Sequence, residues 1–350
     1  MDVFRALERE DHERVVFGFD SRTGLRAIIA IHSTARGPAL GGTRFYPYRS
    51  EEGALDDALD LARAMTLKSA AAELPLGGGK AVIMGDPAQD KTEALLEAYG
   101  RFVDKLGGSY LTAEDVGTTV KDMKVVRTQT PYVTGLPVKD GGSGDPSPAT
   151  AVGVMAAMKV VAERLWENSE LGELRIAVQG VGKVGSALVE LLIEGGAEVT
   201  VGDIDGAALD AVSARGNVSV LPAEEILFAR CDILAPCALG GVLNPQTIPG
   251  LQCQAIVGAA NNQLSSPSDT DELAARDILY APDFIVNAGG IINIAEELNE
   301  YSWERAQSRI SAIGETTRQI LDLAERDQVS AHAAAVSYAQ RHLHPPDAVS

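Results

Sequence analysis

The first hundred residues change their hydrophobic period repeatedly, which predicts a mixture of strands and helices. Apolar runs on both sides of the turn sequence SRTG predict a β-hairpin with Gly24 in its turn. From residue 51 the apolar positions take helical spacing, which predicts a helix that continues to about residue 73. Ser50 is expected to cap this helix, and Lys68 lies near its C-terminal end.

The stretch LPLGGGKAV, residues 74–82, interrupts this pattern with three glycines directly before Lys80. Because glycines carry no side chains, the stretch predicts a bare, flexible loop that presents the lysine. A short buried strand is expected from residue 80, followed by a helix near residues 91–107 and a strand over 109–115.

The second half of the chain has a simpler pattern. The Gly/Pro/Ser-rich sequence GLPVKDGGSGDPSPAT, residues 135–150, is the best candidate for an interdomain hinge. Beyond it, helices alternate with short apolar strands, which predicts a parallel sheet with helices on both faces. After about residue 300 the pattern is helical.

Length and composition limit the possible partners. A chain of 350 residues fits two domains, and its formal charge of −19 disfavours nucleic acid or an anionic membrane as the main partner. No run approaches the ~18 apolar residues of a membrane span. The three cysteines lack CxxC spacing, so neither a metal site nor a disulfide framework is expected. Reduced thiols and the absence of a signal-type N-terminus indicate a cytoplasmic protein.

The sequence RIAVQGVGKVGSALVELLIEGGAEVTVGDID is the strongest local motif. Gly180 allows a tight turn after a strand, Gly182 lets the backbone approach a pyrophosphate, and Gly185 lets the next helix pack closely. Asp203 ends a second strand, 18 residues beyond Gly185, where its carboxylate can accept the ribose hydroxyls. No basic residue follows Asp203 to meet a 2′-phosphate, so the motif predicts NAD rather than NADP.

Two later stretches, residues 235–241 and 257–264, are expected at the carboxyl ends of other strands, where doubly wound sheets bind ligands. Ordinary loop chemistry is the alternative for both. Asn261 is a candidate contact to the nicotinamide ribose or the substrate. The residues expected at the cofactor are Gly180, Gly182, Lys183, Val184, Gly185, Asp203, Ile204, Ala238, Ala260, Asn261 and Asn287.

The candidates for proton chemistry are lysines and an aspartate. None of the five histidines lies in a glycine-rich loop, so a histidine-based dehydrogenase mechanism has no obvious carrier. Lys68, Lys80 and Asp115 all fall in the first half, near the ends of predicted elements. A lysine beside another cation in a water-poor site binds its proton less tightly and can act as a base. A solvated surface charge is the alternative for each lysine taken alone.

Several stretches together resemble the Glu/Leu/Phe/Val dehydrogenase superfamily, which deaminates amino acids oxidatively. They are GPALGGTRFYPY, AMTLKSAAAELPLGGGKAVI, TAEDVGTT, VQGVGKVG, APCALGG, GAANNQL and YAPDFIVNAGGIINIAEEL, in order over about residues 15–300. The resemblance implies that Lys68, helped by the backbone of Gly41, holds the substrate α-carboxylate. It also implies that Lys80 activates water, in room cleared by the glycines, and that Asp115 exchanges protons with it. The substrate and nicotinamide surroundings implied in this way are Asn261 and the backbone around Asn287 and Gly290.

The resemblance also bears on the substrate. Glutamate dehydrogenases typically carry a lysine before the paired glycines of GPALGGTR, where this chain has Leu40. A buried leucine cannot compensate a carboxylate, so glutamate is disfavoured. Ala113, Ile291 and Ile294 match positions that line the side-chain pocket in the family, and their shapes favour valine, leucine or isoleucine. Phenylalanine is the alternative, because apolar pockets discriminate weakly.

These observations predict an α/β protein of two domains separated by a cleft. Residues 1–140 form the substrate and catalytic domain, and residues 141–327 form a Rossmann-type NAD-binding domain. A discontinuous first domain, onto which residues 328–350 pack back, is the alternative. The expected activity is reversible NAD-dependent deamination of an apolar L-amino acid by a homo-oligomer. A catalytically inactive NAD-binding regulator and a hydroxy-acid dehydrogenase are the rival functions.

Overall fold

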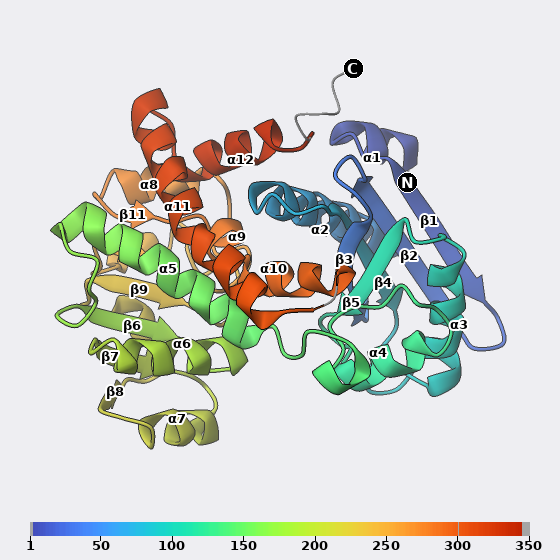
Figure 1. The fold of residues 1–350 in the computed structure, drawn as a ribbon, viewed down its shortest axis with the longest axis horizontal. Helices are drawn as coiled ribbons and strands as arrows, with labels where there is room; N and C mark the ends of the chain where they lie inside the picture. Colours follow the sequence, from blue (N-terminus) through green and yellow to red (C-terminus); the bar gives the residue numbers. More distant parts are fainter. Residues whose placement is uncertain (1–2, 300, 345–350) are drawn as a thin grey trace. The chain divides into compact units, whose positions relative to one another are not determined.

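The computed structural model describes residues 3–299 and 301–344, and the chain divides into two compact units (Figure 1). The first unit contains the chain up to Asp145, residues 294–301 and the chain from Ala339 onward. The second contains residues 146–293 and 302–338. The division after Asp145 lies within the Gly/Pro/Ser-rich stretch, and the first unit is discontinuous in sequence.

The first unit is built on a five-stranded mixed sheet with strand order β1-β2-β4-β3-β5. β1 and β2 pair antiparallel, β2 and β4 pair antiparallel, and the pairs β4–β3 and β3–β5 are parallel. The strands are β1 (Arg14–Asp20), β2 (Leu25–Ser33), β3 (Ala39–Tyr46), β4 (Gly77–Met84) and β5 (Tyr110–Glu114). The predicted hairpin is confirmed, with Gly24 at φ 76° in the turn between β1 and β2.

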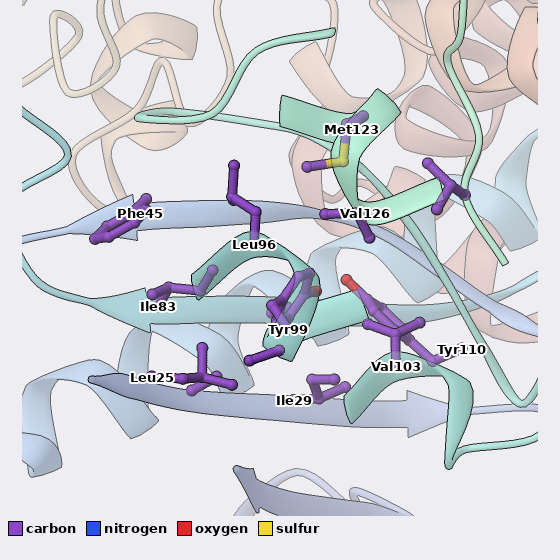
Figure 2. Packing of buried hydrophobic residues seen from close by; sticks show 14 of the residues in the cluster. Leu25, Ile29, Phe45, Ile83, Leu96, Tyr99, Val103, Tyr110, Met123 and Val126 are labelled. Atoms are coloured by element: carbon purple, nitrogen blue, oxygen red, sulfur yellow. The ribbon is translucent and has the colours of Figure 1, made fainter. Parts of the chain in front are cut away.

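The helices of this unit cover both faces of the sheet. They are α1 (Val3–Arg9), α2 (Glu51–Ala71), α3 (Glu93–Asp104), α4 (Val120–Arg127) and the short η1 (Val138–Asp140). Ser50 caps α2 as predicted, because its hydroxyl accepts a hydrogen bond from the Gly53 amide. Figure 2 shows the larger core, in which strand residues such as Ile29 and Ile83 meet Tyr99 of α3 and Met123 of α4.

The opposite face of the same sheet packs against α2. Ile28, Ala30 and Val82 from the strands meet Leu55 and other apolar residues of the helix. Side chains alternate along a strand, so every second residue of β4 points to the same face. Gly78, Lys80 and Val82 therefore all belong to the face that packs against α2. The α2 face of the sheet therefore carries Lys80.

The prediction of a bare loop at residues 77–79 is wrong. The three glycines lie inside β4 and are buried. A Cβ atom on Gly77 would lie 1.9 Å from the Ser33 carbonyl oxygen, and one on Gly78 would lie 2.0 Å from the Thr66 amide nitrogen. The glycines allow neighbouring backbone to approach, and protein atoms fill the space that was expected to hold water.

The second unit contains a six-stranded sheet with strand order β11-β10-β9-β6-β7-β8, in which every pairing is parallel. This is the order of a doubly wound dinucleotide-binding sheet, with its topological switch between β6 and β9. The strands are β6 (Arg175–Gln179), β7 (Glu198–Gly202), β8 (Val218–Val220), β9 (Ile233–Pro236), β10 (Ala255–Ile256) and β11 (Leu279–Tyr280). Sequence analysis missed only β8 among them, a three-residue edge strand.

Helices flank this second sheet in the expected alternation. The helices from residue 146 onward are α5 (Ser147–Trp166), α6 (Lys183–Glu194), α7 (Gly206–Ser213), α8 (Asp269–Ala274), α9 (Asp283–Val286), α10 (Gly289–Ala295), α11 (Trp303–Asp327) and α12 (Ala331–Arg341), with short turns η2 (Ile226–Phe228) and η3 (Ile248–Gly250). The short turn η4 (Glu296–Leu298) and the last residues of α10 and α12 belong to the first unit. Among the residues described, none of the helices has the length and apolar character needed to cross a bilayer.

Candidate active site

The site in the first unit lies on the α2 face of its sheet, where β3, β4 and β5 run side by side. In the parallel ladders Leu40 pairs with Gly78 and with Leu111, and Gly42 pairs with Ala113. Directly paired residues point to the same face, so Leu40 and Ala113 share the face that carries Lys80. Leu40 is 2% exposed and adds a buried apolar side chain to this face.

Lys80 and Asp115 form the ionic centre of this face. Lys80 comes from the middle of β4, Asp115 follows the last residue of β5, and Lys80 Nζ lies 2.5 Å from Asp115 Oδ2. Lys80 is only 6% exposed. A lysine this deeply buried needs a partner charge, and Asp115 supplies it.

A second cation, Arg44 of β3, reaches the same carboxylate oxygen. Its Nε lies 3.4 Å from Asp115 Oδ2. Its Nη1 donates to both carboxylate oxygens of Asp57 in α2, at 2.9 and 3.1 Å. The hydroxyl of Tyr48 also donates to Asp57. Four charges therefore alternate in sign from Lys80 through Asp115 and Arg44 to Asp57.

This arrangement sets the protonation state of Asp115. Burial alone would raise the pKa of the Asp115 carboxyl, but the charge and hydrogen bond of Lys80, together with the charge of Arg44, outweigh it. The net effect is a lowered pKa, so Asp115 is a carboxylate at neutral pH.

The paired glycines of β3 let these strands come close. A Cβ on Gly41 would lie 1.7 Å from the Gly79 carbonyl oxygen, and one on Gly42 would lie 2.8 Å from the Asp115 Cβ. The Tyr110 hydroxyl donates to the Gly41 carbonyl oxygen at 2.6 Å. The glycines thus position Asp115 and Lys80 from neighbouring strands.

Lys68 belongs to the last turn of α2 and is half-buried. The helix crosses β4 two residues earlier, where Thr66 abuts Gly78. Lys68 is therefore on the helix that packs against the Lys80 face.

Of the two isoleucines predicted near the substrate, Ile294 lies in the first unit and Ile291 in the second.

The second unit gathers its predicted residues at the carboxyl ends of its strands. Gly180 follows β6 with φ 93°, a left-handed conformation that favours glycine, and a Cβ there would meet Ala238 at 2.7 Å. A Cβ on Gly185 would lie 2.0 Å from the Gly180 carbonyl oxygen. Gly182, by contrast, has no atom of the described residues within 4 Å of its Cβ position, so this backbone has room for a ligand. Lys183 and Val184 begin α6 directly after it.

Asp203 lies directly beyond β7 and is tied to the same loop. Its Oδ2 accepts from the Val181 amide at 2.6 Å, and its Oδ1 accepts from the Asp205 amide at 2.9 Å. Ile204, between them, is 94% exposed. The carboxylate therefore closes the first glycine turn as well as lying at the end of the second strand.

The ends of β9 and β10 complete this edge. The Ala260 amide donates to the Pro236 carbonyl, and the Asn287 side-chain amide donates to Asn261 Oδ1 at 2.8 Å. Two buried acceptors at this edge, Gln179 Oε1 and Asn287 Oδ1, have no hydrogen-bond partner in the described chain. An open glycine backbone with unsatisfied acceptors beside it fits a dinucleotide with an amide-bearing ring.

Comparison with known proteins identifies the family of this chain. The family described as Glu/Leu/Phe/Val dehydrogenase, dimerisation domain, matches residues 12–132, and Glutamate/Leucine/Phenylalanine/Valine dehydrogenase matches residues 141–215 and 206–344. The chain belongs to the Glu/Leu/Phe/Val dehydrogenase family. It is accordingly an amino-acid dehydrogenase that uses a nicotinamide cofactor.

Individual relatives match over almost the whole chain. A leucine dehydrogenase from Geobacillus stearothermophilus is 47% identical over 98% of this chain and 94% of its own length. A valine dehydrogenase from Streptomyces coelicolor is 48% identical over 98% and 96%. The crystal structure of L-tryptophan dehydrogenase from Nostoc punctiforme superposes with a TM-score of 0.86, at 40% identity over 97% of this chain and 98% of that one.

Sequence analysis did not single out Arg44, Asp57 and Tyr48, which the structure links to Asp115. Arg44 stands two residues beyond Gly42, inside a stretch already identified as motif-like, so strand alternation would have placed it on the Lys80 face. Its contact with Asp57 depends on how α2 packs on the sheet, which no local pattern contains.

Proposed function

We propose that the protein catalyses reversible, NAD-dependent oxidative deamination of branched-chain L-amino acids. The observation that carries this proposal is the buried ion pair of Lys80 with Asp115, on a sheet face that also holds the apolar Leu40. The products are the 2-oxo acid, ammonium and NADH.

Each charged residue has a proposed step. Lys68, with the backbone of Gly41, binds the substrate α-carboxylate. A bound nicotinamide would supply the acceptor for the hydride from Cα. Lys80 in its neutral form takes a proton from water while the water oxygen attacks the iminium carbon. Asp115 pairs with the ammonium formed at Lys80 Nζ and exchanges protons with it.

The residues proposed to hold the cofactor lie along the strand ends of the second unit. Gly182 and the first turn of α6 would face the pyrophosphate, and Asp203 would accept from the adenosine ribose. The sequence after Asp203 is Ile-Asp, with no cation for a 2′-phosphate, which supports NAD over NADP. Further proposed contacts are Lys183, Val184, Gly185, Ile204, Ala238, Ala260, Asn261 and Asn287.

The proposed side-chain pocket is apolar. Leu40 and Ala113 of the first unit are both less than 9% exposed, and burying a substrate carboxylate against them would cost several kcal/mol, which disfavours glutamate. The names of the leucine and valine dehydrogenase relatives favour branched aliphatic substrates. Phenylalanine remains the second candidate.

A substrate panel tests this directly. We expect NADH formation with valine, leucine and isoleucine, a lower kcat/KM with phenylalanine, and almost none with glutamate or with NADP. Ala113→Gly should widen the pocket and raise kcat/KM for phenylalanine relative to leucine by about tenfold, the value of one or two methylene groups. Inactivity with every apolar amino acid at alkaline pH would contradict the proposal.

We also propose that the protein is a homo-oligomer in which β1 pairs with β1 of a second copy. β1 is an edge strand, its Phe17 and Phe19 are 53% and 76% exposed, and it lies in the region matched by a dimerisation domain. An edge strand presents free backbone N–H and C=O groups on every second residue. In an antiparallel pair of two β1 strands, odd-numbered residues of one copy therefore lie opposite odd-numbered residues of the other, and even-numbered opposite even-numbered. The register that overlaps the whole strand sets Phe17 opposite the partner's Phe17 and Arg14 opposite the partner's Asp20.

Cross-linking tests this register. Phe17→Cys should form a disulfide-linked dimer on mild oxidation, whereas Phe19→Cys should not, because its counterpart is the partner's Val15. Phe17→Asp should reduce the particle mass measured by light scattering. A monomeric wild-type protein, or equal cross-linking of both cysteine variants, would exclude the pairing.

The proposed location is the cytoplasm. The three cysteines are all free thiols, and burial raises the pKa of each to about 12. Such unreactive, unpaired thiols suit a reducing compartment.

A further inference from the structure

The two cations on Asp115 differ in one chemical respect. Lys80 is an amine, and in the proposed reaction its proton leaves and returns in every turnover. Arg44 carries a guanidinium, which stays charged at every pH a protein tolerates. One carboxylate oxygen, Asp115 Oδ2, faces both groups, at 2.5 Å from Lys80 Nζ and 3.4 Å from Arg44 Nε.

We propose that Arg44 is a positioning residue that keeps Asp115 ionised and oriented while Lys80 is neutral, and that Asp57 and Tyr48 hold Arg44 for this task. The inference rests on the proposed roles of Lys80 and Asp115. It adds a permanent charge to the site and assigns a purpose to the polar residue Asp57 of α2.

The geometry separates the two ends of the guanidinium. Nη1 is fixed by both oxygens of Asp57, and Asp57 is itself fixed by the Tyr48 hydroxyl. Nε is buried and makes no hydrogen bond within the described chain. Its ion-pair partner is Asp115 Oδ2. Arg44 therefore acts on Asp115 through charge, from a pose set by α2.

A permanent cation is needed because Asp115 is mostly buried. When Lys80 gives up its proton, its attraction for the carboxylate is lost, and burial then favours the protonated acid. Water attack forms the C–O bond, breaks an O–H bond and places the proton on Lys80 Nζ. An anionic Asp115 stabilises the resulting ammonium, whereas a protonated Asp115 would not. Arg44 keeps the anion available at that step.

Two lysines also lie on segments around Asp115, Lys91 and Lys68, and Glu114 directly precedes it in the chain. Lys91 pairs with Asp122 at 2.8 Å and contacts the Gly117 carbonyl in the loop that follows Asp115. Lys68 is the remaining charge on the α2 segment that packs nearest to β4, and it is assigned to the substrate. The acid limb of the pH profile should therefore respond chiefly to Lys80, Asp115, Arg44 and Asp57.

The test compares two variants, of which one removes a positive charge and the other a negative charge. Arg44→Gln removes a positive charge and should shift the acid limb of kcat/KM for leucine upward by about one pH unit, because the coupled Lys80–Asp115 pair then holds its protons more tightly. Asp57→Asn removes a negative charge and should shift the limb downward. Arg44→Lys keeps the charge and should leave the limb near its wild-type position while lowering kcat.

A purely structural Arg44 predicts a different result. Arg44→Gln and Asp57→Asn would then both lower kcat and leave the acid limb in place, or move it in the same direction, and either outcome overturns the proposal. If Arg44→Gln does not fold, Arg44→Lys against Asp57→Asn carries the same test, since only Asp57→Asn should move the limb.

A second measurement separates this proposal from the proposed function. Infrared titration of ¹³C-labelled aspartate carboxyl groups, with Asp115→Asn subtracted, follows Asp115 without turnover. An upward shift in Arg44→Gln supports the positioning role even if no amino acid is oxidised, and an unchanged titration overturns it even in a fully active enzyme.

Discussion

The two units build their sites from opposite materials. In the first, charged side chains from three strands and a helix meet on one buried face, with Lys80 2.5 Å from Asp115. In the second, the strand ends present backbone, and Gly182 has nothing within 4 Å of its Cβ position. Chemistry depends on charge in the first unit and on the absence of side chains in the second.

This contrast predicts how each site fails. The first should fail when a charge is removed, with little change in shape. The second should fail when atoms are added, with no change in charge. The glycines of β4 complicate the division, because in the first unit glycines serve packing rather than binding.

The largest effect should come from Lys80→Ala. The loss of the proposed base should lower kcat for leucine oxidation by about 10³-fold, within the range of general-base contributions. NAD binding, measured by calorimetry, should be unchanged, because the proposed cofactor contacts belong to the other unit. Lys121→Ala, at an exposed position of α4, is the matched control and should keep wild-type activity. More than a few per cent of wild-type kcat in Lys80→Ala would contradict the assignment.

Gly78→Ala should produce the next largest effect, on stability. The added Cβ would lie 2.0 Å from the Thr66 amide nitrogen, so α2 must shift away from β4. We expect a loss of about 3 kcal/mol in the free energy of unfolding, the upper range for overpacking. Urea denaturation measures it, with Gly206→Ala as the control because its Cβ position is open. Equal stability of the two variants would show that the glycine is not needed for packing.

These glycines mark where sequence reasoning stops. The dinucleotide loop was predictable because Gly180, Gly182 and Gly185 follow a fixed spacing within six residues of chain, and a Cβ on Gly185 would meet the Gly180 carbonyl oxygen. The contacts of Gly77 and Gly78 come from Ser33 and Thr66, which are distant in sequence. The motif therefore indicated that glycine was required, while the reason for it depended on strand register and on helix packing.

The same limit applies to the ionic site. Lys80 and Asp115 could be chosen by residue type and by resemblance, since each lies near the end of a predicted element. Their 2.5 Å contact required the parallel order of β4, β3 and β5. Arg44 was overlooked because its partner Asp57 comes from a helix whose placement no spacing rule provides.

Gly182→Val should break the second site without unfolding it. The position has space for a side chain in the protein alone, so thermal stability should stay near that of wild type. A bound pyrophosphate would occupy that space, and we expect the Kd for NAD to rise by about 10- to 100-fold. Gly206→Val, at the first residue of α7, has an equally open Cβ position and should bind NAD normally. Unchanged affinity in Gly182→Val would move the cofactor away from this loop.

The smallest predicted effect is on the pH dependence of stability, and it comes from two buried histidines of the first unit. His12 and His32 meet edge to face with ring centroids 4.7 Å apart, and His32 bonds Thr66 Oγ1 at 2.9 Å and the Glu10 carbonyl at 3.0 Å. A carbonyl only accepts, so Nε2 carries the proton of the neutral ring, and Nδ1 faces the Thr66 hydroxyl, which also lies 3.2 Å from the Ala62 carbonyl oxygen.

Burial, together with the charge of His12, lowers the pKa of His32 to about 4 from 6.5, and burial also lowers the pKa of His12. The unfolded chain therefore binds protons that the folded chain excludes. The stability contributed by the neutral rings is complete above pH 6.5 and is lost as the pH falls toward 4.

For His32 alone, we expect the free energy of unfolding to drop by about 1 kcal/mol between about pH 7.5 and 5.5. His32→Gln should flatten this slope in urea titrations, whereas His344→Gln, at an exposed position, should leave it unchanged. A slope that persists in His32→Gln would assign the acid sensitivity to other groups, and the first unit would then owe less of its stability to buried neutral histidine than its geometry indicates.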